Sequence, residues 1–373
     1  MPARLLQIET VPILRILLAT AHPHIPQIAG GAQSSTHELA RELAARGHET
    51  AVLAGLTGTG WLGMRGRALL KLSGRKAVRD DDLGYSTWRA WHAWEAAAEV
   101  SAAFRPDVAL MQSGQPVKMA AAFEVAGVPV AVYLRNVEED DIGGDPRTLK
   151  AVRFIANSRF TADWYRQRFG IESAVIHPLI QVENYRTETA RNHVVFINPH
   201  KDKGLDVALA VAKACPDIPF LFVETWIMSA DERAALDAAL APLANITLVP
   251  RTRDMRTIYS KARMVLAPSR WAEAFGRIAA EAHVSGIPVI ASDRGGLPEA
   301  VGEGGVLVSA DAPTRAWIDA VRRVWSDEAS YADLSAKALA YAQRPALDRD
   351  AQIAALVVEL QRTLAPARER ASA

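Results

Sequence analysis

The sequence predicts an α/β protein built from two doubly wound domains that face each other across a cleft. Its 373 residues are too many for one ordinary globular core and too few for three. Short apolar runs alternate with segments of helical periodicity, which is the pattern of βαβ units around a parallel sheet. The pattern lapses near residue 180 and restarts at Arg191. We therefore expect domains over residues 1–180 and 190–345, and a C-terminal helix over 346–373 that returns to the first domain.

The first domain opens with the apolar run Leu14–Ala19, which ends at a loop rich in Pro, His and Gly. Helical spacing extends over Ser34–Arg46, and Gly47 follows the last turn, where a C-terminal cap is expected. The next strand, Glu49–Ala54, completes a βαβ unit. Further strands are predicted at Pro106–Met111, Pro129–Leu134 and Phe154–Asn157.

A linker is predicted between Ile176 and Arg191, where Pro178 is followed by a polar run with little periodicity. Ligands of doubly wound sheets bind beyond the carboxyl ends of the strands, so the loops after the strands are where a site is expected. Strands of the second domain are predicted at Arg191–Asn198, Phe220–Glu224, Ile246–Val249, Met264–Ala267, Val289–Ser292 and Val306–Val308.

Composition and charge exclude several classes of protein. The 43 Lys and Arg residues are balanced by 42 Asp and Glu residues, which argues against a protein that coats nucleic acid. The single cysteine, Cys215, cannot form an internal disulfide, so a secreted disulfide scaffold is excluded. The apolar run Val11–Ala21 is broken by Pro12 and Arg15 and is too short to span a membrane, so we expect a buried strand rather than a signal peptide. A cytoplasmic protein is the prediction.

The segment Ala267–Ala282 holds the densest set of candidate site residues. A strand ends there, a short loop carries Glu273, and helical composition begins at Phe275. Free N–H groups at such a helix start suit a phosphate, and Gly276 lets a ligand approach the backbone. Glu273 and Glu281 are eight residues apart, about 12 Å along a helix axis, which suits a ligand with hydroxyl groups on both sides of a diphosphate. Spacing alone equally allows Glu273 to be a helix-dipole partner and Glu281 a solvated acid.

Three more loops follow predicted strands. The adjacent glycines Gly30 and Gly31 precede a helix that Ser34 or Ser35 would cap, and such a loop suits phosphate approach. Lys203 follows a strand of the second domain and could neutralise a diphosphate, although it could equally be solvated. A second glycine loop, Gly295-Gly296-Leu297-Pro298-Glu299, lies one βα unit after Glu273 and should open on the same cleft.

One segment, Gly58–Asp82, breaks the α/β rhythm. Its Gly58-x-Gly60-x-x-Gly63 pattern fits a dinucleotide fingerprint but follows the second strand, so we interpret it as a flexible lead into a basic loop. The cations of Arg65–Arg79 alternate with leucines, and we expect them to meet an acceptor or a membrane surface peripherally. The alternative is a solvated helix of the first domain.

Taken together, these residues resemble the retaining nucleotide-sugar glycosyltransferases of family 4, which have two Rossmann-like domains in the GT-B architecture. The resemblance covers nearly the whole chain. Its most specific part is Pro268–Glu281 with Ser285–Val289 and Gly295–Glu299, and Ala156–Ala162 with Pro178 adds to it. It implies that the N-terminal domain binds the acceptor and the C-terminal domain the nucleotide-sugar donor.

The resemblance also implies the roles of single residues. Glu273 would hold hydroxyls of the donor sugar, Lys203 would bind the diphosphate, and Arg135 is the third catalytic candidate. Two positions depart from the family pattern: Asn198 stands where an arginine is usual, and Arg135 stands near the usual place of a histidine. These departures predict a rearranged set of donor contacts or reduced activity. The donor-binding residues implied are Gly30, Gly31, Asn198, Phe275, Gly276, Arg277, Ile278 and Glu281.

The implied reaction moves a hexose-like sugar from a nucleoside diphosphate to a hydroxyl of a glycan or lipid-linked acceptor, with retention at the anomeric carbon. Resemblance favours front-face attack, with a covalent intermediate as the alternative. No Asp-x-Asp lies in a strand-end loop, since Asp80–Asp82 falls in the basic segment, so we expect no essential metal and no cofactor besides the donor. Two rival functions are a nucleotide-sugar epimerase on the same architecture and an inactive sugar-nucleotide-binding relic.

Overall fold

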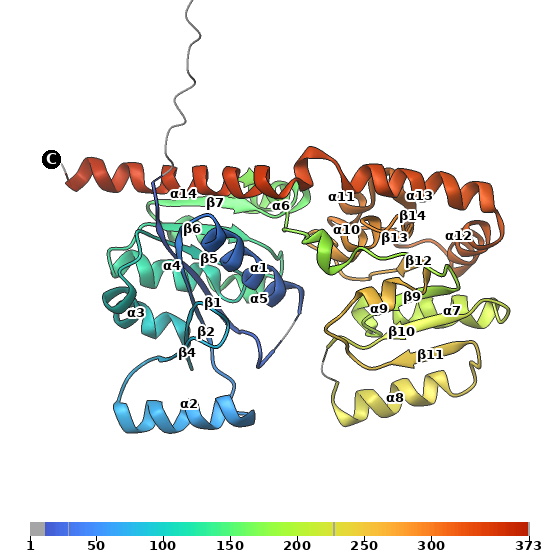
Figure 1. The fold of residues 1–373 in the computed structure, drawn as a ribbon, viewed down its shortest axis with the longest axis horizontal. Helices are drawn as coiled ribbons and strands as arrows, with labels where there is room; N and C mark the ends of the chain where they lie inside the picture. Colours follow the sequence, from blue (N-terminus) through green and yellow to red (C-terminus); the bar gives the residue numbers. More distant parts are fainter. Residues whose placement is uncertain (1–11, 29, 227, 372–373) are drawn as a thin grey trace, which may run out of the picture.

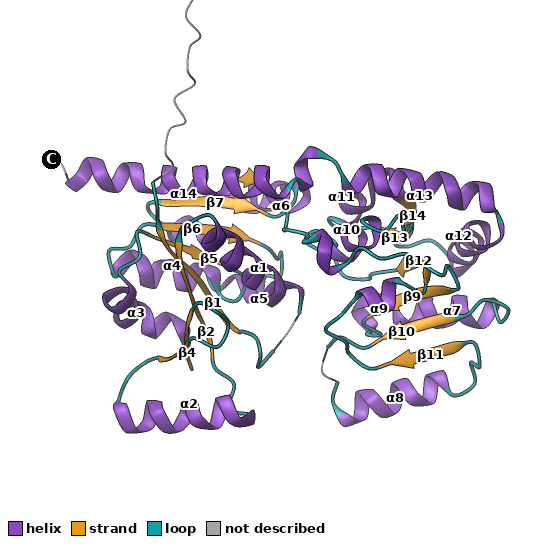
Figure 2. Ribbon diagram, in the orientation of Figure 1, coloured by secondary structure: helices purple, strands orange, loops and turns teal. Residues whose placement is uncertain are grey.

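The computed structural model describes residues 12–28, 30–226 and 228–371 and contains two α/β domains, each with its own sheet (Figures 1 and 2). Parts of the predictions fall outside these residues: Val11 of the first apolar run, residues 1–11 of the first domain, and residues 372–373 of the C-terminal helix. The fold is the predicted pair of doubly wound domains.

The sheet of the N-terminal domain has the strand order β3-β4-β2-β1-β5-β6-β7-β8 among the described residues. All neighbouring pairs are parallel except β3 and β4. The strands are β1 (Arg15–Pro23), β2 (Glu49–Gly55), β3 (Val78–Asp80), β4 (Ser86–Ala90), β5 (Val108–Met111), β6 (Val130–Leu134), β7 (Val152–Ala156) and β8 (Ala174–Val175). The helices are α1 (Gly31–Ala45), α2 (Gly60–Ser73), α3 (Ala97–Phe104), α4 (Pro116–Val125), α5 (Glu139–Ile142) and α6 (Arg159–Phe169), with short 3₁₀ turns η1 (Ala93–Ala96), η2 (Pro146–Thr148) and η3 (Val182–Asn184).

The sheet of the C-terminal domain is parallel throughout its described strands and has the order β11-β10-β9-β12-β13-β14. The strands are β9 (His193–Ile197), β10 (Phe220–Val223), β11 (Ile246–Val249), β12 (Ala262–Ala267), β13 (Val289–Asp293) and β14 (Gly305–Ser309). The helices are α7 (Leu205–Ala214), α8 (Ala230–Leu240), α9 (Arg256–Tyr259), α10 (Arg277–His283), α11 (Leu297–Val301), α12 (Thr314–Ser326) and α13 (Glu328–Ala342), with turns η4 (Lys201–Lys203), η5 (Gly302–Gly304) and η6 (Pro345–Leu347).

Helices cover both faces of each sheet, so the strands are apolar on both sides. On β1, Leu17 belongs to the core on one face and its neighbour Leu18 to the core on the other. On β9, Val195 and Phe196 divide in the same way. This explains why the strands read as continuous apolar runs rather than as alternating ones.

Each sheet reverses its strand order at one place. In the N-terminal domain the chain leaves β1 toward β2 and later returns to β5 on the other side of β1. In the C-terminal domain it leaves β9 toward β10 and returns to β12. The loops after β1 and β5, and after β9 and β12, therefore border the crevices where doubly wound sheets bind ligands.

The linker and the last helix join the two domains. Leu179, Ile180 and Tyr185 of the predicted linker are buried, so it is packed rather than loose. Helix α14 (Arg349–Ala371) crosses back over β5–β7 of the N-terminal domain, and Leu360 shares a core with Leu14 (Figure 1). No helix among the described residues is long and apolar enough to cross a membrane.

Two local predictions need correction. For the basic segment, the loop interpretation is wrong and the alternative of a helix in the first domain is confirmed: Gly60–Ser73 forms α2, and Val78–Asp80 forms an edge strand antiparallel to its neighbour. Neither Ser34 nor Ser35 caps the first helix, because α1 already begins at Gly31 with Gly30 as its N-cap residue. In both places a glycine that suggested a loop starts a helix instead.

Candidate active site

Lys203 and Glu273 meet at the carboxyl ends of β9 and β12. Lys203 Nζ lies 2.7 Å from Glu273 Oε1, and the Ser269 hydroxyl donates to the same oxygen over 3.3 Å. The loops can approach because residue 204 is glycine: its φ is +80°, and a Cβ there would lie 1.9 Å from the Pro268 carbonyl oxygen. Glu273 Oε2 receives no hydrogen bond from the described residues. The pair thus offers one ammonium group and one free carboxylate oxygen.

The Glu273 loop is held from two sides. The Gly296 N–H donates to the Glu273 carbonyl over 2.6 Å, so the second glycine loop packs against the first, as the sequence suggested. From the N-terminal domain, the hydroxyl of Ser158, the N-cap residue of α6, donates to the Ala274 carbonyl. Nearby, Glu299 accepts from the Arg159 N–H at 2.8 Å. The loop therefore sits at the domain boundary.

Aromatic rings surround the Lys203 ammonium. Lys203 Nζ is 5.3 Å from the ring centroids of both Trp226 and Trp271, distances at which a cation is attracted to the ring face. The Trp271 indole also faces Glu138 of the N-terminal domain; burial raises the pKa of Glu138, and the indole opposes that shift. The two tryptophans were not predicted as site residues, and only their position after strand ends could have indicated them.

Asn198 ends β9 with its side chain in an unusual state. It is 4% exposed, its backbone is left-handed with φ +65°, and neither Oδ1 nor Nδ2 has a hydrogen-bond partner among the described residues. A buried amide without partners is costly, so such a group in a native fold calls for an explanation. The amide stands at the end of β9, five residues before Lys203.

Arg277 and Glu281 lie in a different environment from Glu273. Arg277 Nε donates to Glu281 Oε1 over 3.0 Å, and the Tyr259 hydroxyl donates to Glu281 Oε2 over 3.1 Å. The Arg277 guanidinium also crosses to the N-terminal domain, where it pairs with Glu38 at 3.2 Å. It bonds Tyr185 and the Leu179 carbonyl as well. All these groups are buried, and both oxygens of Glu281 are occupied.

Neighbouring charges and burial shift the pKa values of this network in opposite directions. Burial raises the pKa of Glu38, although the Arg277 guanidinium acts against the shift. Burial alone would lower the pKa of Arg277, but Glu38, Tyr185 and Glu281 together raise it well above its usual range. The arginine therefore stays charged and holds an ion pair across the domain boundary. Glu38 was not predicted, because its partner is 239 residues away in sequence.

The remaining predicted donor-binding residues lie around the Lys203–Glu273 pair and the Arg277 network. They are Gly30, Gly31, Phe275, Gly276 and Ile278. Gly31 lies beside the Arg277 stem, since a Cβ there would be 3.7 Å from Arg277 Cδ, and Gly30 precedes it as the N-cap residue of α1. The Phe275 ring is buried against His177, and Ile278 packs on the same core. Gly276 is the left-handed N-cap residue of α10, so helix α10 starts two residues later than the sequence suggested. The side chains of Phe275 and Ile278 are core, which leaves only their backbone for a ligand.

No hydrogen bond or ion pair joins Arg135 to the Lys203–Glu273 pair among the described residues. Its guanidinium donates to Gln112 Oε1 at 2.5 Å and to the Thr36 hydroxyl at 3.3 Å, both within the N-terminal domain. Burial lowers the pKa of Arg135 to about 10, and the nearby Arg277 charge adds to the shift. The Nε2 atom of Gln112, at the end of β5, has no partner among the described residues. Arg135 thus borders the N-terminal crevice beside the Arg277 network.

His22 and Asp141 form a pair that sequence reasoning missed. His22, at the carboxyl end of β1, places Nε2 2.9 Å from Asp141 Oδ1, and its side chain is 42% exposed. Asp141 Oδ2 accepts from the Gly114 N–H at 3.1 Å and from the Asn136 amide. Three strand-end loops therefore converge on one carboxylate that orients the imidazole. The position of His22 directly after the first strand was the available signal.

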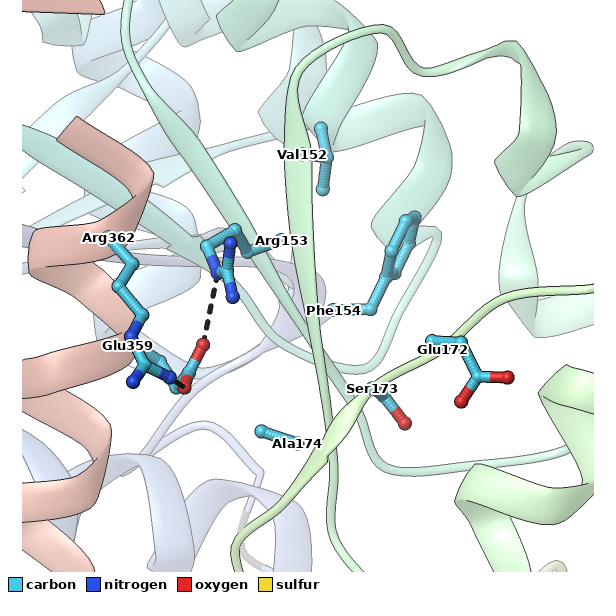
Figure 3. A pocket seen from close by; sticks show the side chains of 8 residues that line it. All are labelled: Val152, Arg153, Phe154, Glu172, Ser173, Ala174, Glu359 and Arg362. Carbon is cyan, nitrogen blue, oxygen red and sulfur yellow. Dashed lines mark hydrogen bonds and ion pairs between the residues drawn. The ribbon is translucent and has the colours of Figure 1, made fainter. Parts of the chain in front are cut away.

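A hollow of about 350 Å³ lies elsewhere, between β7, β8 and α14 (Figure 3). Arg153 reaches Glu359 across it, and Arg362, on the same helix as Glu359, pairs with that carboxylate from the helix side (Figure 3). Because Val152, at its edge, is the first residue of β7, the hollow lies at the amino end of that strand, opposite to where such sheets bind ligands. We do not assign the donor to it. Among the described residues, no group of three or more His, Cys, Asp or Glu side chains could hold a metal ion.

Comparison with known proteins identifies the class. The fold is shared over nearly the whole chain by a glycosyltransferase from Rickettsia africae ESF-5, with a TM-score of 0.75, 15% identity, and coverage of 95% of this chain and 99% of that one. Anabaena HepE in complex with UDP-glucose matches with a TM-score of 0.70, 17% identity, and coverage of 96% and 100%. The molecule therefore has the GT-B architecture of two facing Rossmann-like domains, as the resemblance implied.

The family models match each domain separately. The model described as Glycosyltransferase Family 4 matches residues 29–184, and the model described as Glycosyl transferases group 1 matches residues 191–327. D-inositol 3-phosphate glycosyltransferase of Mycobacterium tuberculosis strain H37Rv is 29% identical over 215 residues, or 50% of this chain. The match spans less than half of that relative, 43% of its length. The chain belongs to the family 4-like glycosyltransferases with the GT-B fold.

Proposed function

We propose that the protein is a retaining glycosyltransferase that moves a hexose-like sugar from a nucleoside-diphosphate sugar to an acceptor hydroxyl. The observation that carries the proposal is the Lys203–Glu273 pair at the strand-order reversal of the C-terminal sheet. The free oxygen of Glu273 suits a sugar hydroxyl, and the ammonium of Lys203 suits a diphosphate. We assign the product to glycan, polysaccharide or glycolipid biosynthesis.

In the proposed reaction, the bond between the anomeric carbon and the diphosphate oxygen breaks while a bond to the acceptor oxygen forms on the same face. The acceptor proton passes to the departing diphosphate. Positive charge gathers on the sugar ring and negative charge on the diphosphate, so preorganised charges at both places lower the barrier. Lys203 would stabilise the diphosphate, the Asn198 amide would donate to it, and Glu273 would orient the sugar. No metal and no cofactor other than the donor is needed in this scheme.

We propose that the acceptor binds on the N-terminal side, over His22 and Asp141. Because Asp141 takes the Nε2 hydrogen bond, the other ring nitrogen of His22 is available to an acceptor hydroxyl. Arg135 would add a positive charge beside the Arg277 network. A His22→Ala enzyme should show a raised KM for acceptor, with donor hydrolysis in the absence of acceptor unchanged. Equal loss of both activities would contradict the acceptor role.

We further propose that the enzyme works in the cytoplasm, at the membrane periphery. Its single cysteine, Cys215, is free and buried, which suits a reducing compartment. Nucleotide-sugar donors and a glycan or lipid-linked acceptor are the partners proposed.

A panel of nucleotide sugars tests the function. UDP-glucose is the first donor to try, because HepE was solved with it. Binding is scored by thermal shift, turnover by released nucleotide, and stereochemistry by NMR of the anomeric proton. Product formed from donor alone would indicate an epimerase. Tight donor binding without turnover over an acceptor panel would indicate a binding relic. The specific reason to consider a relic is Asn198, which stands where the family usually has an arginine. Retained turnover in chelator would support the metal-free scheme.

A further inference from the structure

Helix α2 presents an apolar face to solvent. Trp61, Met64 and Leu72 are 76%, 57% and 85% exposed, and Leu69 is also exposed. With Ala68, the first three follow the spacing i, i+3, i+7 and i+11, which places them on one stripe of the helix. Figure 1 shows α2 at the margin of the N-terminal domain, on the side opposite to α14. Single exposed apolar residues are common, but a stripe along one helix is not.

The opposite face of α2 explains why this stripe points outward. Gly63, Gly66 and Leu70 are its buried residues. A Cβ at Gly63 would lie 2.3 Å from the Thr57 carbonyl oxygen, and one at Gly66 would lie 3.0 Å from the Leu56 side chain. Only glycine permits this close packing. The helix therefore cannot rotate its large apolar side chains toward the domain without losing that contact.

Cations border the stripe on both sides. At 100° per residue, Arg65 lies on one flank, and Arg67 and Lys71 lie on the other. Within the described residues, these three and Arg75 have no carboxylate at ion-pair distance, and the segment Gly58–Arg79 contains no acid. Lys76 and Arg79 differ, because they pair with Glu95 and Asp81 respectively. Within the segment Gly58–Arg79, the cations without an ion-pair partner are thus confined to α2 and its C-terminal turn.

We propose that α2 docks the enzyme on an anionic lipid bilayer, with the Trp61–Leu72 stripe in the interface and the flanking cations on lipid phosphates. An apolar stripe between cations, with tryptophan among its residues, is the pattern of helices that lie in a membrane surface. A purely acidic protein surface would satisfy the cations but leave the stripe in water. This confines the membrane contact to α2 and excludes Lys76 and Arg79 from it.

The position of α2 connects the bilayer to the N-terminal crevice. Helix α2 follows the carboxyl end of β2, and Thr57 just before it exchanges hydrogen bonds with Gln27 of the loop after β1, at 2.8–3.2 Å. A bilayer on α2 would therefore lie beside the rim that carries His22. This arrangement favours a lipid-linked acceptor that stays in the membrane during transfer.

Sedimentation with vesicles tests the proposal. We expect the wild type to bind vesicles of phosphatidylcholine with added phosphatidylglycerol and not vesicles of phosphatidylcholine alone. Arg65→Gln/Lys71→Gln should lower the partition coefficient about thirtyfold, since each surface cation contributes about five- to sixfold. Trp61→Ser/Leu72→Ser should lower it about tenfold or more. The matched controls are Arg315→Gln/Arg323→Gln on α12 and Val125→Ser, an exposed valine at the end of α4, and these should bind as the wild type does.

Three results would overturn the proposal: no binding to anionic vesicles, equal binding to both compositions, or unchanged binding by both α2 variants. The first would leave an acidic protein as the partner to seek. Because the altered side chains are exposed, thermal unfolding should be the same for all variants. The assay contains neither donor nor acceptor, so its outcome is independent of the proposed transfer reaction.

Discussion

Glu273 and Glu281 are eight residues apart in one motif, yet the fold gives them opposite surroundings. Glu273 has Lys203 and Ser269 on one oxygen and no partner among the described residues on the other. Glu281 has Arg277 on one oxygen and Tyr259 on the other, and it is 8% exposed. Each carboxylate thus accepts two hydrogen bonds, but Glu273 keeps one oxygen wholly free for a ligand, whereas both oxygens of Glu281 already have a protein donor.

The difference shows that the motif performs two tasks. The Glu273 end leaves polar groups open at the strand ends, which suits recognition of a substrate that supplies the missing bonds. The Glu281 end joins Arg277 to Glu38 across the domain boundary, where a buried ion pair fixes geometry more than it adds stability. For Glu281 to bind a nucleotide ribose, as the family resemblance implies, the ribose hydroxyl must use the second lone pair of an oxygen that already accepts from Arg277 or Tyr259.

Removing Arg277 should have the largest effect, and it falls on stability. Arg277→Leu leaves Glu38 and Glu281 buried without their cation, so unfolding should become easier by about 3 kcal/mol or more. The measurement is the urea midpoint. Arg270→Leu is the control, because it breaks an exposed pair with Asp206 and should cost less than about 1 kcal/mol. Equal costs for both variants would mean that the network across the boundary adds nothing.

Glu273→Gln should lower the rate of transfer and leave the stability of the fold nearly unchanged. It keeps the shape but removes the charge that is proposed to contact the sugar, so turnover with a cognate donor should fall about a hundredfold. Thermal unfolding should be nearly unchanged, since the side chain has few partners. Turnover near the wild-type level would refute the assignment of Glu273, whatever the donor.

His283 supplies an unpaired group beside Gly304, at the amino end of β14 and away from the carboxyl ends of the strands. It is fully buried, neither ring nitrogen has a partner among the described residues, and burial lowers its pKa to about 3. The folded protein keeps the ring neutral while the unfolded chain takes up a proton below pH 6.5. Unfolding free energy should therefore fall with pH from 6.5 toward 3, by up to about 1.4 kcal/mol per pH unit.

The test compares the pH slope of stability rather than its absolute value. His283→Leu should flatten the slope, whereas the same change at the exposed His92 should leave it as in the wild type. Part of the slope will remain, because burial also lowers the pKa of His24 to about 3. A slope unaltered by His283→Leu would show that the buried ring is protonated in the folded state.

Asn198 should give the smallest effect and the sharpest contrast with His283. Asn198→Gly suits the left-handed backbone and removes a buried amide without partners, so stability should hold or rise by up to about 1 kcal/mol. Donor affinity measured by calorimetry should fall about tenfold, as expected for hydrogen bonds to a charged group. Unchanged donor affinity would make the amide a structural feature only.

Sequence reasoning predicted every described strand of the C-terminal sheet and β1, β2, β5, β6 and β7 of the N-terminal sheet, because each is a short apolar run bounded by turn residues, but it listed no strand at β3, β4 or β8. It also picked out Lys203 and Glu273, whose positions after strands identify them without knowledge of the contact. It missed the Glu38–Arg277 and His22–Asp141 pairs, since nothing local links residues more than a hundred positions apart. It left α2 open between a loop and a solvated helix, because glycines that weaken a helix in isolation here permit close packing.

The sequence by itself determined the two doubly wound domains, their family and the loops that carry the chemistry, because strand and helix patterns and strand-end position are local properties. Only the tertiary structure decided which glutamate keeps a free oxygen and which has a protein donor on both, and which side of α2 faces water. Those outcomes depend on burial and on partners from distant parts of the chain. The hydrogen-bonding capacity that remains after folding is therefore a property of the fold, even where the sequence already identifies the residues that carry it.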